Sequence, residues 1–199
     1  MKIIGVTGGI GSGKSTVCKF VSSNFSVEII DADILAKKQY DSEVIQKKIL
    51  SVFPEMKSFD ISELSKNVFE NQETINKLTR IIYPELLKDI QEIISEQKTI
   101  GQVSAVLIDA ALIIESNFHS YLQKNYQYKL VLVESNEQER IKRVFKKNNL
   151  SIEEIQQRMK LQLSDAEKSQ YADYLISNSG NIEQLRVQTL NVFQDILSH

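Results

Sequence analysis

One segment near the amino terminus restricts the possible folds of this chain more than any other feature. Its residues match the Walker A pattern Gly-x-x-x-x-Gly-Lys-Ser at every defined position: Gly8, Gly9, Ile10, Gly11, Ser12, Gly13, Lys14 and Ser15. An apolar run at residues 3–6 precedes it, and Val17, Phe20 and Val21 follow it at helical spacing. The segment is therefore expected to join a buried strand to a helix as a phosphate-binding loop.

The residue types of this loop explain the chemistry expected of it. Glycines let backbone N–H groups ring the phosphate oxygens, because a Cβ would block the loop conformation or the close approach. The following helix adds the positive end of its dipole. Lys14 is expected to reach the β- and γ-phosphates, Ser15 to offer its hydroxyl to Mg²⁺, and Thr16 to touch the α-phosphate. A turn that only joins strand to helix is the alternative, and the Lys-Ser pair argues against it.

The remaining pattern is typical of one α/β domain of 199 residues. Short apolar segments predict strands at residues 3–6, 27–30, 103–108, 130–133 and 175–176. Long helical stretches separate them, which implies crossover connections and a parallel sheet covered on both faces. Residues 33–98 are expected to be helical, with Pro54 and Pro84 interrupting them.

Charge and cysteine content narrow the possible partners. The net charge of -2 gives no indication of nucleic acid or an acidic membrane surface as a partner. The single cysteine, Cys18, cannot form an internal disulfide, which favours a reducing compartment. The amino-terminal apolar run is too short for a signal peptide or a membrane span. We expect a soluble cytoplasmic protein that acts on small molecules, as a monomer or a weak homo-oligomer.

Two carboxylates follow the second predicted strand. Asp31 and Asp33 lie at the carboxyl end of that strand, the edge at which parallel sheets bind ligands. Residues two apart on an extended segment point the same way, so both are expected to face the site. One can take the proton of a hydroxyl acceptor, and the other can orient the acceptor or hold Mg²⁺ through water. Alternatively, Asp33 caps a helix that begins at Ile34.

A third carboxylate, Asp109, ends the predicted strand at residues 103–108. This is where a Walker B residue stands, and it can bind Mg²⁺ through water. A solvated loop acid is the alternative. Because Ala110 follows it, the Asp-Glu pair usual in mechanical ATPases is absent, and the nearest match to the Asn-Lys-x-Asp loop of guanine-specific switches ends on Thr79. Both absences favour a kinase over a nucleotide switch.

Residues 139–147 form a basic amphipathic segment. Arg140, Arg143 and Lys147 are spaced to share one helix face. A mobile basic lid would exclude water from the transferred phosphoryl group and offset its negative charge. The alternative is an ordinary solvated face.

Together these motifs resemble the dephospho-coenzyme A kinase family of P-loop kinases, over residues 1–197. Residues 4–16 are close to the family signature, residues 30–33 are similar to its acidic motif, and residues 112–115 to a Leu-Leu-Phe-Glu segment. The family's carboxyl-terminal pattern is matched by Arg158, Met159, Gln162, Lys168, Ala172, Asp173, Asn178, Ser179 and Gly180.

The resemblance implies transfer of the γ-phosphoryl group of ATP, with Mg²⁺, to the 3′-hydroxyl of dephospho-coenzyme A. It implies Asp33 as the base and Arg143, helped by Arg140, beside the transition state. It also places Asn178 and Gly180 near the adenine. Acceptor binding is implied for three further residues: Asp31, Tyr83 and Glu115.

Four positions depart from the family pattern, at Ile61, Tyr83, Ala111 and the pair Lys147-Asn148. They leave the contacts to the coenzyme A body open, since Tyr83 stands where the family usually has a histidine and carries no positive charge at neutral pH.

The family resemblance also implies a three-layer sandwich with a parallel central sheet. Its parts would be a core (residues 1–33, 99–135 and 172–199), a helical acceptor-binding lobe (34–98) and a helical lid (136–171). Rival small-molecule kinases fit less well. Shikimate-type kinases usually carry a later Gly-Gly-Arg, and nucleoside monophosphate kinases a proline in the loop, and both are missing from this sequence.

Overall fold

The computed structural model describes residues 1–68, 71–147 and 150–198. The chain divides into two compact units, one made of Met1–Asp31 and Glu96–His199 and the other of Ala32–Ser95. The strands all belong to the first unit: β1 (Lys2–Thr7), β2 (Val27–Asp31), β3 (Ala105–Asp109), β4 (Tyr128–Glu134) and β5 (Tyr174–Ser177). Its helices are α1 (Lys14–Ser22), α6 (Phe118–Asn125), α7 (Glu137–Lys147), α8 (Ile152–Lys160), α9 (Asp165–Ser169) and α10 (Ile182–Ser198).

The five strands form one sheet in the order β2-β3-β1-β4-β5, and every pairing is parallel. This confirms the α/β class and the parallel central sheet. All five predicted strands are present, but the third begins at Ala105 and not at residue 103. Ser104 lies in the preceding turn, where its N–H donates to the Ser26 carbonyl oxygen.

The strand register places three functional positions at one edge of the sheet. Asp109 is the register partner of both Asp31 on β2 and Val6 on β1. The phosphate-binding loop begins just after Val6 and Thr7. Parallel strands therefore bring the loop and two carboxylates to the same carboxyl edge.

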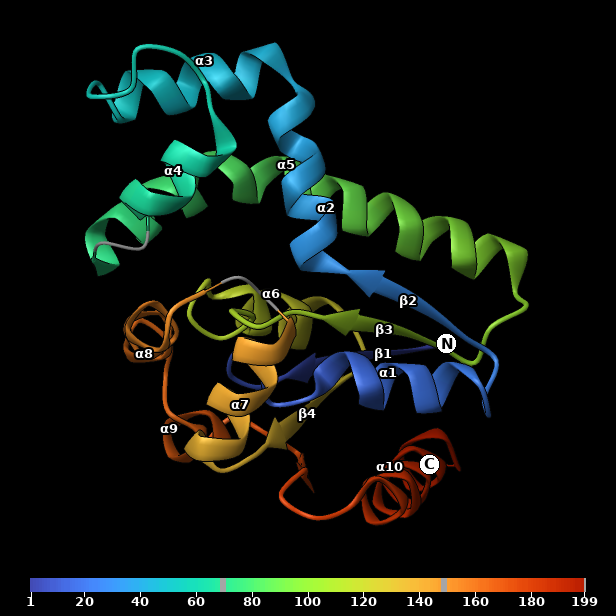
Figure 1. Ribbon diagram of the computed structural model, residues 1–199. Helices are drawn as coiled ribbons and strands as arrows, with labels where there is room; N and C mark the ends of the chain where they lie inside the picture. Colours follow the sequence, from blue (N-terminus) through green and yellow to red (C-terminus); the bar gives the residue numbers. More distant parts are fainter. Residues whose placement is uncertain (69–70, 148–149, 199) are drawn as a thin grey trace. The chain divides into compact units, whose positions relative to one another are not determined.

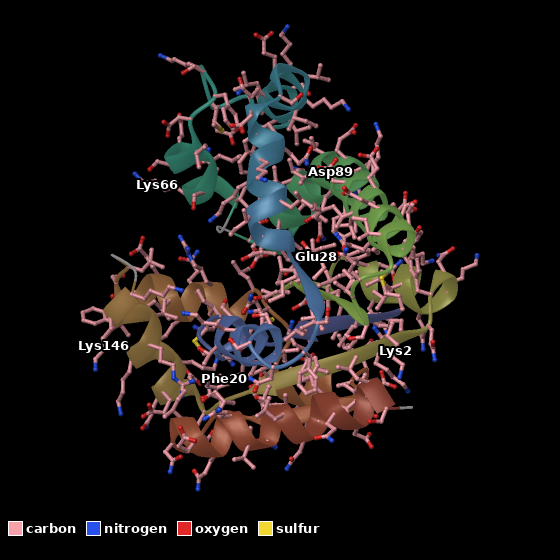
Figure 2. All side chains as sticks on the ribbon, turned by 90° about the vertical axis from the view of Figure 1, so that its right-hand side faces the viewer. Lys2, Phe20, Glu28, Lys66, Asp89 and Lys146 are labelled. Carbon is pink, nitrogen blue, oxygen red and sulfur yellow. The ribbon has the colours of Figure 1, made fainter. Side chains whose placement is uncertain are left out.

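Helices α1 and α10 cover one face of this sheet (Figure 1). Their buried apolar residues form a common core with inward residues of β1, β3, β4 and β5, and Phe20, labelled in Figure 2, packs against that core. Cys18 lies in this core as a free thiol. Burial and the nearby carboxylate of Asp109 raise its pKa far above the usual range, so it stays protonated. The opposite face meets Ile113, which lies near Gly5 of β1.

The second unit is helical among its described residues. It contains α2 (Ala32–Lys38), the short 3-10 helix η1 (Gln39–Asp41), α3 (Glu43–Val52), α4 (Ile61–Val68) and most of α5 (Gln72–Ile100). The expected break at Pro84 is wrong, because Pro84 lies inside α5. A proline removes one backbone hydrogen bond, but the helix continues because a buried stripe on both sides holds it: Ile75, Ile82, Leu86, Ile90 and Ile94.

No helix in the described part of the chain is both long and apolar enough to span a membrane.

His119 gives the first unit an acid-sensitive contact. Its ring is buried at 8% exposure and meets Tyr128 and Tyr171 edge-on. Burial lowers the pKa of His119, with the Asp173 carboxylate opposing the shift. The folded chain therefore favours the neutral imidazole, whereas the unfolded chain binds a proton as the pH falls below about 6.5. Stability is lost in that direction.

We expect His119→Phe, which keeps a ring but cannot titrate, to reduce the loss of stability between pH 7.5 and 5. The measurement is the urea midpoint of both proteins across this range. The other histidine, His199, lies outside the described residues. Parallel pH curves for the two proteins would show that His119 does not contribute to acid sensitivity.

Candidate active site

The phosphate-binding loop has the backbone that its glycines allow. Gly11 and Gly13 adopt φ of 77° and 105°, in the left-handed region that side chains rarely tolerate. A Cβ on Gly9 would lie 1.9 Å from Nη2 of Arg140, so this position also requires glycine, here because a side chain packs against it. Gly13 is the N-cap of α1 and no side chain caps that helix end. An uncapped helix amino terminus beside a glycine loop is suited to an anion.

The carbonyl oxygens of the loop are held by donors from several elements. Lys14 Nζ donates to Gly8 O at 3.1 Å, and the Ser12 N–H to Gly9 O at 3.0 Å. Asn178 is the residue that follows β5, and its Nδ2 donates to Ser12 O at 2.7 Å. These bonds engage the loop carbonyls, which would repel a phosphate if they turned toward it.

Arg140 and Arg143 of α7 supply the other donors. Arg140 Nε lies 2.9 Å from Ile10 O, and Arg143 Nη1 lies 3.3 Å from Gly11 O and 3.4 Å from Ser12 O. Arg143 Nη2 also donates to Asn178 O at 2.8 Å. In this structure both guanidinium groups therefore hold the loop backbone.

The remaining basic residues of α7 differ from these two arginines. Arg140 is only 8% exposed and lies 3.5 Å from a carboxylate oxygen of Asp165. Lys146 and Lys147 are exposed, and Figure 2 shows Lys146 on the outer side of the helix. Asn148, which follows Lys147 in the expected lid, lies outside the described residues. One side of α7 thus holds the loop through Arg140 and Arg143, whereas Lys146 and Lys147 at its end are solvated.

Ser15, Asp109 and Asp31 form the candidate metal position. Ser15 Oγ donates to Asp109 Oδ2 at 3.4 Å, and Asp109 is 5% exposed at the end of β3. Asp31 ends the neighbouring strand in register with Asp109. The donors are all hard oxygens, which Mg²⁺ prefers. Within the described part of the chain no group of three His, Cys, Asp or Glu side chains could hold a metal by itself. This set fits Mg²⁺, which usually uses one or two protein oxygens together with phosphates and water.

Asp33 has a different local setting from the one expected. The strand ends at Asp31 and α2 begins at Ala32, so Asp33 lies in the first turn of a helix and not on an extended segment. The alternative that a helix begins at Ile34 is wrong for the same reason. Asp33 is exposed and belongs to the second unit, as does Tyr83 of α5.

Glu115 is paired with a buried lysine. Its Oε1 lies 2.7 Å from Nζ of Lys168, which has 0% side-chain exposure and also donates to Ala111 O at 2.7 Å. Burial lowers the pKa of Lys168, and the Glu115 carboxylate opposes that shift. Glu115 Oε1 further accepts from the Leu163 N–H at 3.0 Å. Glu115 thus anchors residues 163–168 to the segment after β3. The acceptor binding that the family resemblance implies for Glu115 stays a prediction.

Two residues near the loop escaped prediction of a role from the sequence, although both belong to the motif pattern. Gln162 Oε1 accepts from the Ile10 N–H at 2.8 Å, and Lys168 is the buried partner of Glu115. Gln162 lies 152 residues along the chain from Ile10, and Lys168 lies 57 residues from Ala111, so no periodic pattern links either pair. Gly180, by contrast, lies in an exposed turn beside Gln184, two residues after Asn178.

Comparison with known proteins agrees with this geometry. The family model described as dephospho-CoA kinase matches residues 2–184. The dephospho-CoA kinase of Carboxydothermus hydrogenoformans is 34% identical over 200 residues, covering 98% of this chain and 94% of that protein. That of Fusobacterium nucleatum is 32% identical over 188 residues, covering 92% of each.

Solved structures show the same relationship. TT1252 from Thermus thermophilus superposes with a TM-score of 0.80 at 28% identity, covering 99% of this chain and 98% of that one. The dephospho-CoA kinase from Campylobacter jejuni gives 0.65 at 25% identity, covering 100% and 98%. A shikimate kinase from Acinetobacter baumannii, at 0.54 and 18% identity over 98% and 93% of the two chains, shares the fold.

The family model spans nearly the whole chain, and both of the relatives named above exceed 30% identity over more than nine-tenths of it. With a complete phosphate-binding loop at the carboxyl edge of a parallel sheet, this chain belongs to the dephospho-CoA kinase family of P-loop kinases.

Proposed function

We propose that this protein transfers the γ-phosphoryl group of ATP to the 3′-hydroxyl of dephospho-coenzyme A, which gives coenzyme A. The observation that carries the proposal is the phosphate-binding loop, whose carbonyls from Gly8 to Ser12 all accept hydrogen bonds from donors within the chain. A loop held in this way is prepared for phosphate before the nucleotide arrives, and such preorganisation is the main source of catalysis in phosphoryl transfer. Family membership supplies the acceptor.

Lys14 is the residue that we assign to the transferred group. Its Nζ lies 3.1 Å from Gly8 O at the start of the loop, within the cradle itself. A flexible ammonium group here can follow the β- and γ-phosphates and offset the charge that develops on the oxygens. The same phosphates would accept hydrogen bonds from the backbone N–H groups of residues 12–16, at the amino terminus of α1.

Ser15 and Asp109 would hold Mg²⁺, with Asp31 as a further oxygen donor through water. The ion, when bound, neutralises negative charge on the phosphates. Asn178 and Gly180 are proposed to border the adenine. For Asn178 this role is compatible with its loop contact, because the Nδ2 group that donates to Ser12 O places the residue at the loop.

Asp33 is proposed as the base that takes the proton of the acceptor hydroxyl. It is an exposed carboxylate in the first turn of α2, two residues beyond Asp31. A carboxylate that hydrogen-bonds the hydroxyl orients it for in-line attack and accepts its proton as the P–O bond forms. Asp31, Tyr83 and Glu115 remain proposed acceptor contacts. The three-part division into core, lobe and lid also stays a prediction, as do the cytoplasmic location and the oligomeric state.

In this proposal, Arg143 and Arg140 offset phosphate charge without contacting the phosphates. Their donors hold carbonyl oxygens of Ile10, Gly11 and Ser12, so they act as positioning residues whose positive charge adds to the field of the cradle.

A coupled kinase assay with three acceptors tests the assignment. We expect ADP formation with dephospho-coenzyme A, and little with shikimate or a nucleoside monophosphate. Activity with the monophosphate alone would remove the acceptor assignment and leave the fold. ADP formation at the same rate without any acceptor would instead support a nucleotide switch.

A further inference from the structure

Side chains hold both the backbone N–H and the backbone C=O of Ile10, in the middle of the loop. Gln162 Oε1 accepts from the Ile10 N–H at 2.8 Å, and Arg140 Nε donates to Ile10 O at 2.9 Å. The two partners come from the segment between β4 and β5, 152 and 130 residues along the chain from Ile10. The middle of the loop is therefore fixed from outside.

Ile10 needs such external contacts because of its neighbours. Gly9 and Gly11 flank it, and glycine has the widest conformational freedom of any residue. Neither peptide plane next to Ile10 is restricted by a side chain on the adjoining residue. The Gly9–Ile10 plane is held at both of its polar groups, because the Ser12 N–H donates to Gly9 O at 3.0 Å and Gln162 accepts from the Ile10 N–H. The bond from Arg140 to Ile10 O holds the next plane.

Gln162 is itself held firmly in place. Its own N–H donates to Met159 O at 3.2 Å at the end of α8. The next residue, Leu163, donates its N–H to Glu115, whose carboxylate is paired with the fully buried Lys168. Because the backbone on either side of Gln162 is held, its side chain reaches the Ile10 N–H from a fixed position.

We propose that Gln162 is a positioning residue of the phosphate-binding loop. Its amide oxygen is the contact from outside the loop that holds the N–H side of the Gly9–Ile10 peptide plane, so that the following N–H groups converge on the phosphates. A neutral amide suits this position, because a carboxylate there would add negative charge close to bound phosphate. The consequence for catalysis rests on the proposed function, but the consequence for phosphate binding does not.

The test measures binding of two probes, ATP and inorganic tripolyphosphate, by calorimetry in the absence of an acceptor. Gln162→Met keeps the length of the side chain and removes the acceptor oxygen. We expect both probes to bind about tenfold more weakly, the effect of one lost hydrogen bond that leaves a partly buried donor unpaired. The matched control is Gln156→Met, the same change at an exposed position of α8, which should leave both affinities unchanged.

Equal losses for ATP and tripolyphosphate identify the phosphate cradle as the part affected. Unchanged affinity for both probes, or a loss for ATP alone, overturns the proposal. Thermal unfolding of each variant is recorded so that binding is measured well below its midpoint. If Gln162→Met does not fold, Gln162→Asn replaces it, since its oxygen falls one methylene short of the Ile10 N–H and the same losses are expected.

Steady-state kinetics then separate the two proposals. With dephospho-coenzyme A as acceptor, Gln162→Met should raise the KM for ATP by about the same factor as the dissociation constant. If the parent protein does not phosphorylate dephospho-coenzyme A, the proposed function fails, while the binding comparison still decides the role of Gln162.

Discussion

Replacing Lys14 by methionine is expected to lower kcat on the order of 10²- to 10³-fold and to weaken ATP binding as well. Methionine keeps the unbranched chain but removes the ammonium group, which donates to Gly8 O and would follow the transferred phosphoryl group. The negative charge on the phosphate oxygens is then offset less both in the bound ground state and in the transition state. The affinity for ATP and the rate of the chemical step therefore fall together. Single-turnover kinetics at saturating ATP isolate the chemical step.

Lys19→Met provides the control for this prediction. Lys19 is an exposed lysine in the last turn of the same helix, α1, so the substitution removes the same charge away from the loop. We expect its kinetics to match those of the parent. Circular dichroism and urea unfolding of both variants would separate loss of the loop contact from loss of fold. An unchanged single-turnover rate for Lys14→Met at saturating ATP would contradict the cradle assignment.

The second large effect is expected for Asp33→Asn, which should reduce phosphoryl transfer by about 10²- to 10⁴-fold and leave ATP binding intact. Asparagine retains the shape and can still hydrogen-bond a hydroxyl, but it cannot accept the proton. Asp33 is exposed in the first turn of α2, so its replacement should not disturb a buried contact. The measurements are kcat with dephospho-coenzyme A and the dissociation constant for ATP.

Asp41→Asn is the matched control, because Asp41 is an exposed carboxylate of η1 in the same unit. Its kcat should be that of the parent. Turnover near the parent rate in Asp33→Asn would remove Asp33 from the role of base and make Asp31, at the end of β2, the next residue to test.

Local sequence pattern was enough to predict the framework of the first unit. Apolar runs bounded by turn residues predicted all five strands, because a strand buried on both faces of a parallel sheet needs a nearly continuous apolar segment. The wrong prediction of a break at Pro84 arose because a local signal was outweighed by tertiary packing. Proline is a local signal for a break, but the buried face of α5 is a tertiary feature that outweighs one missing backbone bond.

The setting of Asp33 shows a similar limit. Sequence pattern placed it after a strand, but could not decide whether the extended backbone continues past Asp31 or turns at once into helix. The two possibilities differ by only one or two residues in where the helix begins. Local residue preferences predict the presence of a helix or strand better than its exact boundary.

The phosphate-binding loop could be predicted from local pattern alone, since Gly8 to Ser15 carry their conformational and chemical requirements within eight consecutive residues. The contacts that hold the loop are seen only in the folded chain. Gln162, Arg140, Arg143 and Asn178 reach Ile10, Gly11 and Ser12 from 130 to 166 residues away. Contacts of this kind leave no periodic trace in the chain, because they depend on how the segment between β4 and β5, and the turn after β5 that carries Asn178, fold back to the phosphate-binding loop.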